Sequence, residues 1–256
     1  MIEDTGFFFT ALVVGLVAQL IDGAIGMAYG VTSSLALISL GSSPAIASAS
    51  VHTAQVFTTL VSGGSHFKFG NVRKDILLPL AAFGIVGGAL GAYGLTSLPA
   101  GPVRLVVNVV LLSMGCTILY KHVAMGTVTR REPKYSSKHL SGLGFIGAFI
   151  DAVGGGGWGP VCTSTLVATG TNPSKAVGSV NLAEFFVTTA QTLTFLCLIG
   201  WERFRWEAVV GLVLAGVVVA PFSAYACGKM PRRLLGILVG MVVVFLTARN
   251  LTLIAL

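Results

Sequence analysis

The sequence has little charge. Only 10% of its 256 residues are Asp, Glu, Lys or Arg, whereas a soluble domain needs roughly 25% to cover its surface. The four cysteines fall in apolar segments without disulfide or metal-ligand spacing, which indicates buried free thiols. Nucleotide-binding loops, serine-hydrolase elbows and HExxH zinc motifs are absent. The sequence therefore predicts no enzyme, no cofactor and no bound metal, and a surface that largely faces lipid.

Apolar residues make up 54% of the chain, and the mean hydropathy is +0.89. Apolar stretches of about 20 residues recur, and each is long enough to cross a hydrocarbon core of roughly 30 Å as a helix. They lie at about 6–26, 44–66, 76–98, 102–122, 173–200, 206–228 and 232–254. The first has no basic residue before it and no small-residue cleavage site, so we interpret it as a span rather than a signal peptide. An all-α integral protein of the plasma (inner) membrane is predicted, with the lipid bilayer as its surroundings.

Two parts of the chain resemble each other. Residues 15–59 align with residues 144–188 at a constant offset of 129, without a gap and with 14 identities in 45 positions. The matched pairs include Asp22 with Asp151, Gly26 with Gly155, Gly30 with Gly159, Gly41 with Gly170, Pro44 with Pro173, and Ser50 with Ser179. Matched Asp, Gly and Pro positions do not follow from an apolar composition. We divide the chain into a first transmembrane repeat (1–122), a basic linker (123–138) and a second repeat (139–256), which form one membrane domain.

The net charge of +7 would suggest a nucleic-acid partner in a soluble protein. Here the basic residues lie in short loops between spans, where they set orientation in the membrane, and no nucleic-acid binding is predicted. The loop 67–75 is basic, while the equivalent loop 201–207 is balanced, and the bias reverses at the next loop of each repeat. This reversal predicts two inverted repeats, with the linker cytoplasmic and both termini extracytoplasmic.

Each repeat opens with an interrupted helix. In the first, Gly23, Gly26 and Gly30 lead into a short apolar stretch, 30–41, and in the second, four glycines from Gly154 lead to a proline. About 12 residues make a helix of roughly 18 Å, which is too short to span. We therefore expect a broken, half-length helix pair followed by three transmembrane helices in each repeat. Free N–H groups at the start of a half-helix attract anions.

With these features the sequence resembles the TauE/SafE family of sulfite-exporter-like membrane proteins over essentially its whole length. The resemblance rests on the segment Gln19–Gly23 around Asp22, the Gly-rich break 154–159, and two Gly-Xaa2-Pro-Xaa2-Ala-Xaa2-Ser-Val runs, Gly41–Val51 and Gly170–Val180. It implies a secondary transporter that exports a small sulfur-containing anion, such as sulfite, thiosulfate, sulfoacetate or a related organosulfonate. The missing nucleotide-binding motif favours coupling to an ion or proton gradient.

Polar residues beside the breaks form the predicted substrate site. His52 aligns with Asn181 and Gln55 with Glu184, two to three helical turns into the spans that follow the half-helices. His, Asn and Ser side chains can donate hydrogen bonds to an oxyanion; the alternative for each is an interhelical bond that stabilises packing. The predicted substrate-binding residues are Gly26, Gly30, Ser33, Ser50, His52, Gln55, Gly155, Gly156, Gly157, Thr163, Ser179 and Asn181.

Three acidic residues, Asp22, Asp151 and Glu184, lie within apolar segments, where an ionised group is costly and marks a function or a specific partner. Asp22 and Asp151 precede the breaks, so they either cap broken backbone or carry a coupling proton. Glu184 or His52 are the other candidates for proton coupling. A second hypothesis is a cation or metal transporter with these three acids as ligands, and a third is a membrane-embedded scaffold or enzyme with a sulfur-carrier partner.

Overall fold

The computed structural model describes residues 2–255 apart from 125–132, 228 and 230–231. Much of the predicted linker 123–138, with Arg130 and Arg131, lies outside the described residues. Within the described part, all regular structure is helical, which confirms the predicted all-α class.

The two halves of the chain have the same order of helices. The first half contains α1 (Ile2–Ile25), α2 (Tyr29–Ser39), α3 (Pro44–Lys68), α4 (Lys74–Ser97) and α5 (Ala100–Ala124). The second half contains α6 (Ser137–Gly154), the π-helical turn η1 (Gly159–Thr163) continued by α7 (Ser164–Ala168), α8 (Pro173–Ile199), the short 3-10 turn η2 (Trp201–Arg203), α9 (Trp206–Ala226) and α10 (Arg232–Ala255). Each half therefore has a broken helix pair followed by three long helices, as predicted.

Several helices match the dimensions of a bilayer. Five segments of the described chain are long and apolar enough to cross a membrane: Gly6–Ile25, Lys74–Ser97, Leu105–Val123, Pro173–Ile199 and Trp206–Ala226. Large apolar side chains such as Phe222 and Phe245 are about 70% and 69% exposed, which suits contact with lipid rather than water. The protein is thus a multi-pass membrane protein.

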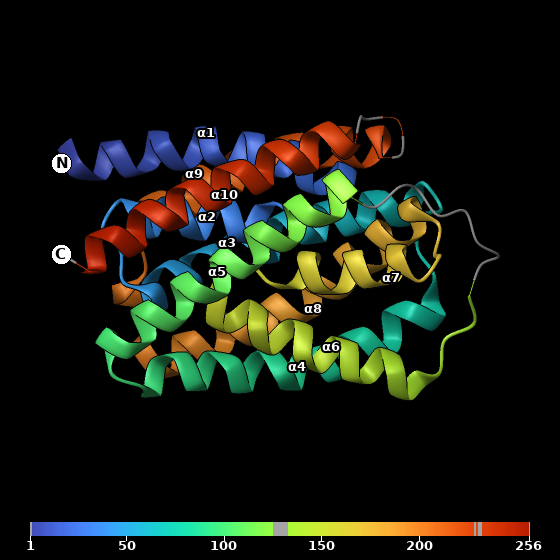
Figure 1. The fold of residues 1–256 in the computed structure, drawn as a ribbon, viewed down its shortest axis with the longest axis horizontal. Coiled ribbons are helices and arrows are strands. Elements are labelled where there is room, and N and C mark those ends of the chain that lie inside the picture. The colour runs from blue at the N-terminus through green and yellow to red at the C-terminus, as the bar shows by residue number, and fades with distance from the viewer. Residues whose placement is uncertain (1, 125–132, 228, 230–231, 256) are drawn as a thin grey trace.

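Equivalent helices of the two halves make equivalent contacts. Helix α1 packs against α9, and α6, the counterpart of α1, packs against α4, the counterpart of α9; α3 packs on α8 and α5 on α10. Helices α1 and α6 run in opposite directions, and the first turn of α1 and the last turn of α10 lie at the same end of the molecule (Figure 1). These orientations support the inverted-repeat interpretation.

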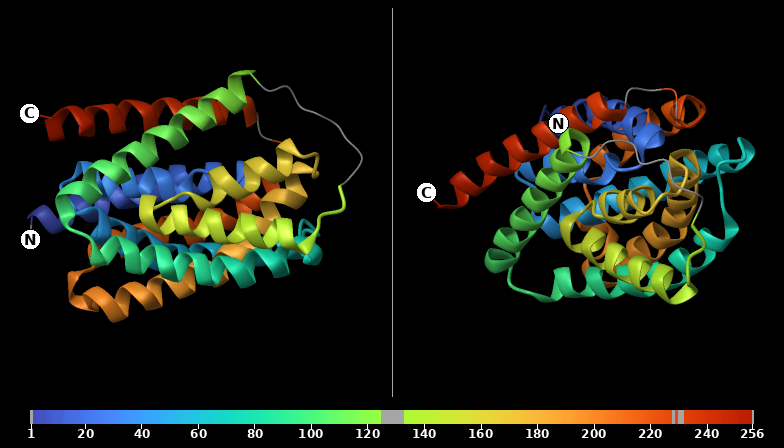
Figure 2. Two further views of the ribbon diagram at one scale, coloured as in Figure 1. Left: turned by 60° about the horizontal axis from the view of Figure 1, so that its bottom comes forward. Right: turned by 45° about the vertical axis from the view of Figure 1, so that its right-hand side comes forward.

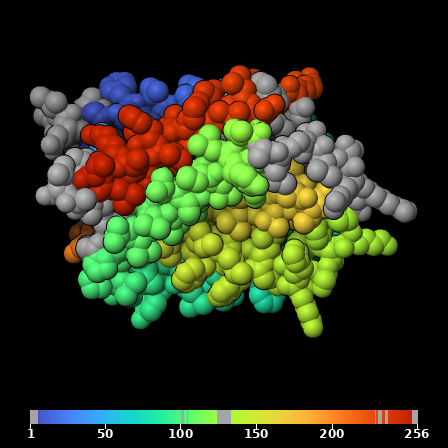
Figure 3. All heavy atoms as spheres, viewed as in Figure 1, coloured from blue at the N-terminus to red at the C-terminus, as the bar shows by residue number. Residues whose placement is uncertain are grey.

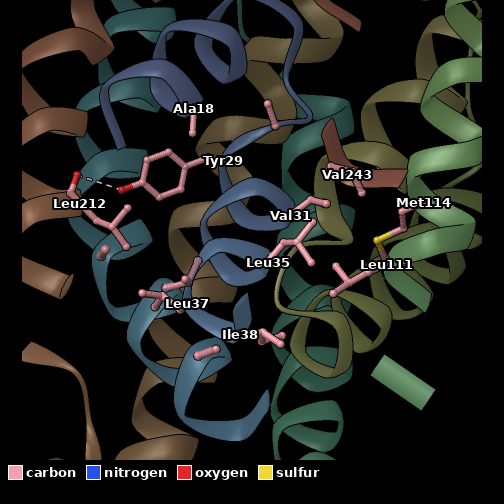
Figure 4. Close-up of a cluster of buried hydrophobic side chains, with 14 of the residues drawn as sticks. Ala18, Tyr29, Val31, Leu35, Leu37, Ile38, Leu111, Met114, Leu212 and Val243 are labelled. Carbon is pink, nitrogen blue, oxygen red and sulfur yellow. Dashed lines mark hydrogen bonds between the residues drawn. The ribbon is translucent and has the colours of Figure 1, made fainter. Parts of the chain in front are cut away.

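The half-length helix α2 is buried in protein. Helices α5 and α10 pack against each other over one face of the molecule (Figures 2 and 3). Their apolar residues, including Leu111 and Val243, belong to the same buried cluster as Val31 and Leu35 of α2 (Figure 4). On another side of α2, the Tyr29 hydroxyl donates to the carbonyl of Leu212 on α9, at 3.0 Å. Burial of this kind is what irregular backbone at membrane depth requires.

The repeated Gly-Xaa2-Pro run forms the same turn twice. Gly41 and Gly170 end the half-helices with φ angles of +93° and +105°, values that glycine adopts without a Cβ penalty. Ser43 and Asn172 then cap the next helices through their side-chain oxygens. Pro44 and Pro173 follow at the first helical position, where the missing N–H costs nothing. The motif thus reverses the chain and starts the polar helices α3 and α8.

Candidate substrate site

Asp22 and Asp151 hold the two breaks in shape. Oδ1 of Asp22 accepts hydrogen bonds from the backbone N–H groups of Ala28 and Tyr29, at 2.9 and 3.3 Å. Oδ1 of Asp151 accepts those of Gly157 and Trp158, at 2.7 and 3.0 Å. These donors are equivalent under the 129-residue offset. The two carboxylates therefore make the hydrogen bonds that the capping interpretation predicts.

The two breaks pack directly on each other. A Cβ added to Gly30 would lie 2.7 Å from Cα of Gly156, and one added to Gly159 would lie 2.6 Å from Cα of Met27. Gly155 has a φ of +69° and ends α6 in the left-handed conformation. The Ser34 hydroxyl donates to the Gly155 carbonyl across this contact. The predicted glycines are thus needed where backbone meets backbone.

His52 is bound to the second break. Its Nδ1 lies 2.7 Å from the carbonyl oxygen of Ser48, and its Nε2 lies 3.0 Å from Oδ2 of Asp151. A carbonyl only accepts, so Nδ1 carries a proton, and a second proton lies between Nε2 and the carboxylate. His52, Ser48 and Asp151 are all buried. Gln191 Nε2 also donates to Oδ2 of Asp151, at 3.0 Å. Both ring nitrogens of His52 are therefore engaged by protein, and neither is directed to a ligand.

Asn181 occupies the corresponding place beside the first break. It lies next to Asp22, and its Oδ1 accepts a hydrogen bond from Ser62 at 2.9 Å. Its Nδ2 is buried and makes no close hydrogen bond. Asn181, unlike His52, thus has an amide N–H group beside the Asp22 carboxylate that no protein atom holds at close range.

Gln55 and Glu184, which are equivalent in the two halves, meet each other. Nε2 of Gln55 donates to Oε1 of Glu184 at 2.8 Å, where α3 crosses α8. Both side chains are buried. A Cβ on Gly30 would lie 3.4 Å from Nε2 of Gln55, so this pair adjoins the crossing of the two breaks. Asn181 precedes Glu184 by three residues and therefore shares its face of α8.

Ser50 and Ser179, which are equivalent in the two halves, each accept a backbone N–H group. The Ser50 hydroxyl accepts the backbone N–H of Arg205 at 2.9 Å, and Ser179 accepts that of Arg73 at 2.8 Å. Arg73 and Arg205 are the residues before α4 and α9. Each hydroxyl therefore connects its own half to the start of a long helix in the other half, which is the geometry of a helix anchor.

Buried polar atoms without a partner gather beside the breaks. Within the described residues they include Ser33 Oγ, Thr163 Oγ1, Asn181 Nδ2 and Gln55 Oε1. A Cβ on Gly26 would lie 3.0 Å from Thr163 Oγ1. A buried polar atom without a hydrogen-bond partner costs free energy of folding unless a ligand or water binds it. Their position next to the crossing glycines identifies this region as the candidate binding site.

Comparison with known proteins agrees with the residues that suggested the resemblance. The family model described as "Sulfite exporter TauE/SafE" matches residues 11–250. The chain belongs to the TauE/SafE family. A curated relative, the "Probable membrane transporter protein YtnM" of Bacillus subtilis (strain 168), is 41% identical over 241 residues, which cover 93% of this chain and 80% of the relative. No solved structure matches the chain.

As a TauE/SafE protein, the chain is a membrane transporter. The geometry bears on the cation-transport alternative as well. No group of three or more His, Cys, Asp or Glu side chains within the described residues is arranged to hold a metal ion. Two of the three proposed acidic ligands, Asp22 and Asp151, have an oxygen occupied by backbone N–H donors. A cation would have to compete with these donors.

The sequence reasoning gave no role to two residues of this TauE/SafE site, Ser62 and Gln191. Each completes one of the polar groups just described, Ser62 at Asn181 and Gln191 at Asp151. The 129-residue register would have revealed them, because it places Ser62 on Gln191 when it is continued three positions past residue 59.

Proposed function

We propose that this protein is a secondary transporter that exports a small sulfur-containing anion, such as sulfite, thiosulfate, sulfoacetate or a related organosulfonate, across the plasma membrane. The anion is bound where the two glycine breaks cross, and its movement is coupled to an ion gradient. The observation that carries this proposal is the set of buried, unpartnered polar groups at the crossing, Ser33, Thr163, Asn181 and Gln55.

The donors of this site suit a small ligand that accepts hydrogen bonds. Thr163 and Ser33 offer hydroxyl groups, Asn181 offers amide N–H groups, and Gln55, whose Nε2 donates one N–H to Glu184, offers the second N–H of that nitrogen. The backbone N–H groups at the starts of α2 and η1 already donate to Asp22 and Asp151, so the donors left for the anion are these side-chain groups.

Calorimetric titration of the purified protein with thiosulfate, sulfite, sulfoacetate, chloride, Mg²⁺ and Zn²⁺ tests the substrate class. We expect saturable binding of one or more sulfur anions and none of the cations. Tight divalent-cation binding that disappears in Asp22→Asn and Asp151→Asn would establish the cation-transport alternative in its place.

Thr163→Val and Asn181→Ala test the position of the site. Each removes one hydrogen bond to a charged ligand, worth about 1.5–3 kcal/mol, so the dissociation constant should rise roughly tenfold or more. Thr117→Val on the exposed face of α5 is the matched control, because it removes a hydroxyl that bonds only its own helix. Dissociation constants within twofold of wild type for both site variants would show that the substrate binds elsewhere.

His52→Ala is a poor probe of ligand contact. It would leave the Asp151 carboxylate buried with one partner fewer, a change that costs about 3–5 kcal/mol in comparable buried pairs. Its main effect should be loss of folded protein.

A further inference from the structure

We propose that the Gln55–Glu184 pair holds one proton while the anion is bound, so that proton and anion occupy the site together. This inference rests on the proposed function. It assigns the coupling proton to one of the four candidates, Glu184, and excludes Asp22, Asp151 and His52.

Glu184 is the least satisfied of the three buried acids. Asp22 accepts two backbone N–H bonds, and Asp151 accepts two together with those of His52 and Gln191. Within the described residues, the Glu184 carboxyl group receives a single hydrogen bond, from Gln55. A buried carboxylate needs several donors or a cation to stay ionised. Among the acids, Glu184 is therefore the one whose charge the protein does least to stabilise.

The surroundings of Glu184 supply no positive charge to replace the missing donors. The acidic groups nearest to it are Asp22 of α1 and Asp151 of α6, and the proton that Asp151 shares with His52 compensates the Asp151 charge. Helix η1 contributes the Cys162 thiol, α3 contributes Gln55 and His52, and α7 has no titratable residue. Along α4, Lys74 and Asp75 lie at its exposed N-terminal end and Tyr93 is also exposed. An anion that binds beside Gln55 therefore adds negative charge next to the carboxyl groups of Glu184 and Asp22, unless a proton binds with it.

His52 cannot supply this proton reversibly without breaking its own contacts. Its Nδ1 proton is held by the Ser48 carbonyl, and the proton between Nε2 and Asp151 makes that pair neutral as a whole. The His52–Asp151 pair therefore carries no net charge in this structure.

The amide of Gln55 can hold Glu184 in both protonation states. Its Nε2 donates to Oε1 of Glu184, a contact that an ionised or a protonated carboxyl group can accept. Its Oε1 is buried and without a partner, so it can accept from the O–H that forms when a proton from water binds the carboxylate. The second N–H of Nε2, on the side where Gly30 lies, is then available to the anion without facing a charged neighbour. On release of the anion the O–H bond breaks and the proton returns to water.

Calorimetry with thiosulfate in two buffers of different ionisation enthalpy measures the protons taken up per anion bound. Thiosulfate is the probe because it stays fully ionised near neutral pH and takes up no proton itself. At pH values above the range in which Glu184 titrates, we expect close to one proton per anion for wild type and an affinity that falls about tenfold per pH unit, as linkage requires for one co-bound proton. Glu184→Gln is neutral at every pH, so it should bind thiosulfate with no proton uptake and with a pH-independent affinity.

Glu202→Gln, the same chemical change on an exposed acid of η2, is the matched control and should behave as wild type. Thiosulfate binding to wild type without proton uptake would overturn this inference and leave the proposed function standing. Unchanged proton uptake in folded Glu184→Gln would also overturn it, because the proton would then bind elsewhere. The absence of any sulfur-anion binding by wild type would overturn the proposed function, and this inference with it. The proton count of wild type alone decides the matter if Glu184→Gln does not fold.

Discussion

Replacing Gly156 with alanine tests whether the contact between the two breaks is as close as the structure has it. The new Cβ would lie 2.0 Å from the backbone nitrogen of Val31 and 2.2 Å from the carbonyl carbon of Gly30. Non-bonded heavy atoms prefer a separation of roughly 3.5 Å, so the two chain segments must move apart by more than about 1 Å. No side chain can relieve the clash by rotation, since both neighbours are backbone.

Overpacking of this kind typically costs about 1–3 kcal/mol, and the rigidity of both partners places Gly156→Ala at the upper end of that range. A loss of about 3 kcal/mol lowers the ratio of folded to unfolded protein more than a hundredfold. Gly30→Ala approaches the same contact from the other side, with its Cβ 2.7 Å from Cα of Gly156, and should cost less because the overlap is smaller.

The measurement is the free energy of unfolding in mixed detergent micelles, together with the yield of monodisperse protein. Gly64→Ala is the control, because a Cβ there has no heavy atom within 4 Å outside its own helix. It should stabilise α3 by about 0.5–1 kcal/mol through reduced backbone entropy of the unfolded chain. If Gly156→Ala proved as stable as Gly64→Ala, the two breaks would not be in contact and the site described above would not exist in this form.

Two further predictions concern the acids and the topology. Asp151→Asn should lower the free energy of unfolding by about 3–5 kcal/mol because it breaks the buried pair with His52. Asp22→Asn should cost about 1–2 kcal/mol, since its neighbour Asn181 is neutral, and the exposed Asp75→Asn should cost less than about 1 kcal/mol. Equal losses at the two buried acids would refute the proton shared by His52 and Asp151. Reporter domains that are active only in the cytoplasm should be silent when fused to either terminus and active when inserted in the linker 123–138, and strong activity from both termini would reverse the predicted orientation.

The sequence was sufficient for the architecture because its signals are long and repeated. Apolar stretches of bilayer length indicated the helices, and the matched positions Asp22/Asp151 and Pro44/Pro173 indicated two copies of one unit. The structure adds that each of these prolines starts a helix, after a Ser or Asn that caps it. These features are local, and local patterns are what a single sequence records.

The partners of the polar side chains could not be read in the same way. His52 and Asp151 are 99 residues apart in the chain, and Ser50 meets the backbone of Arg205 across 155 residues. The sequence indicated that Ser50, His52 and Ser179 lie near the breaks, but not that protein groups already occupy them. Which polar atoms remain available is decided by tertiary contacts between α3, α8 and the half-helices, and no spacing along the chain carries that information.

Positions that are identical in the two halves and positions that differ make different kinds of contact. Residues that are identical in the two halves, such as Asp22 and Asp151 or Ser50 and Ser179, make equivalent backbone hydrogen bonds. Residues that differ, His52 against Asn181 and Gln55 against Glu184, lie at the contacts where protons and charge are held. A symmetric scaffold lets the halves exchange equivalent arrangements, which alternating access requires. Under the proposal above, the proton binds to Glu184 of α8 and not to its counterpart Gln55 of α3, so its binding can bias which arrangement the anion leaves from.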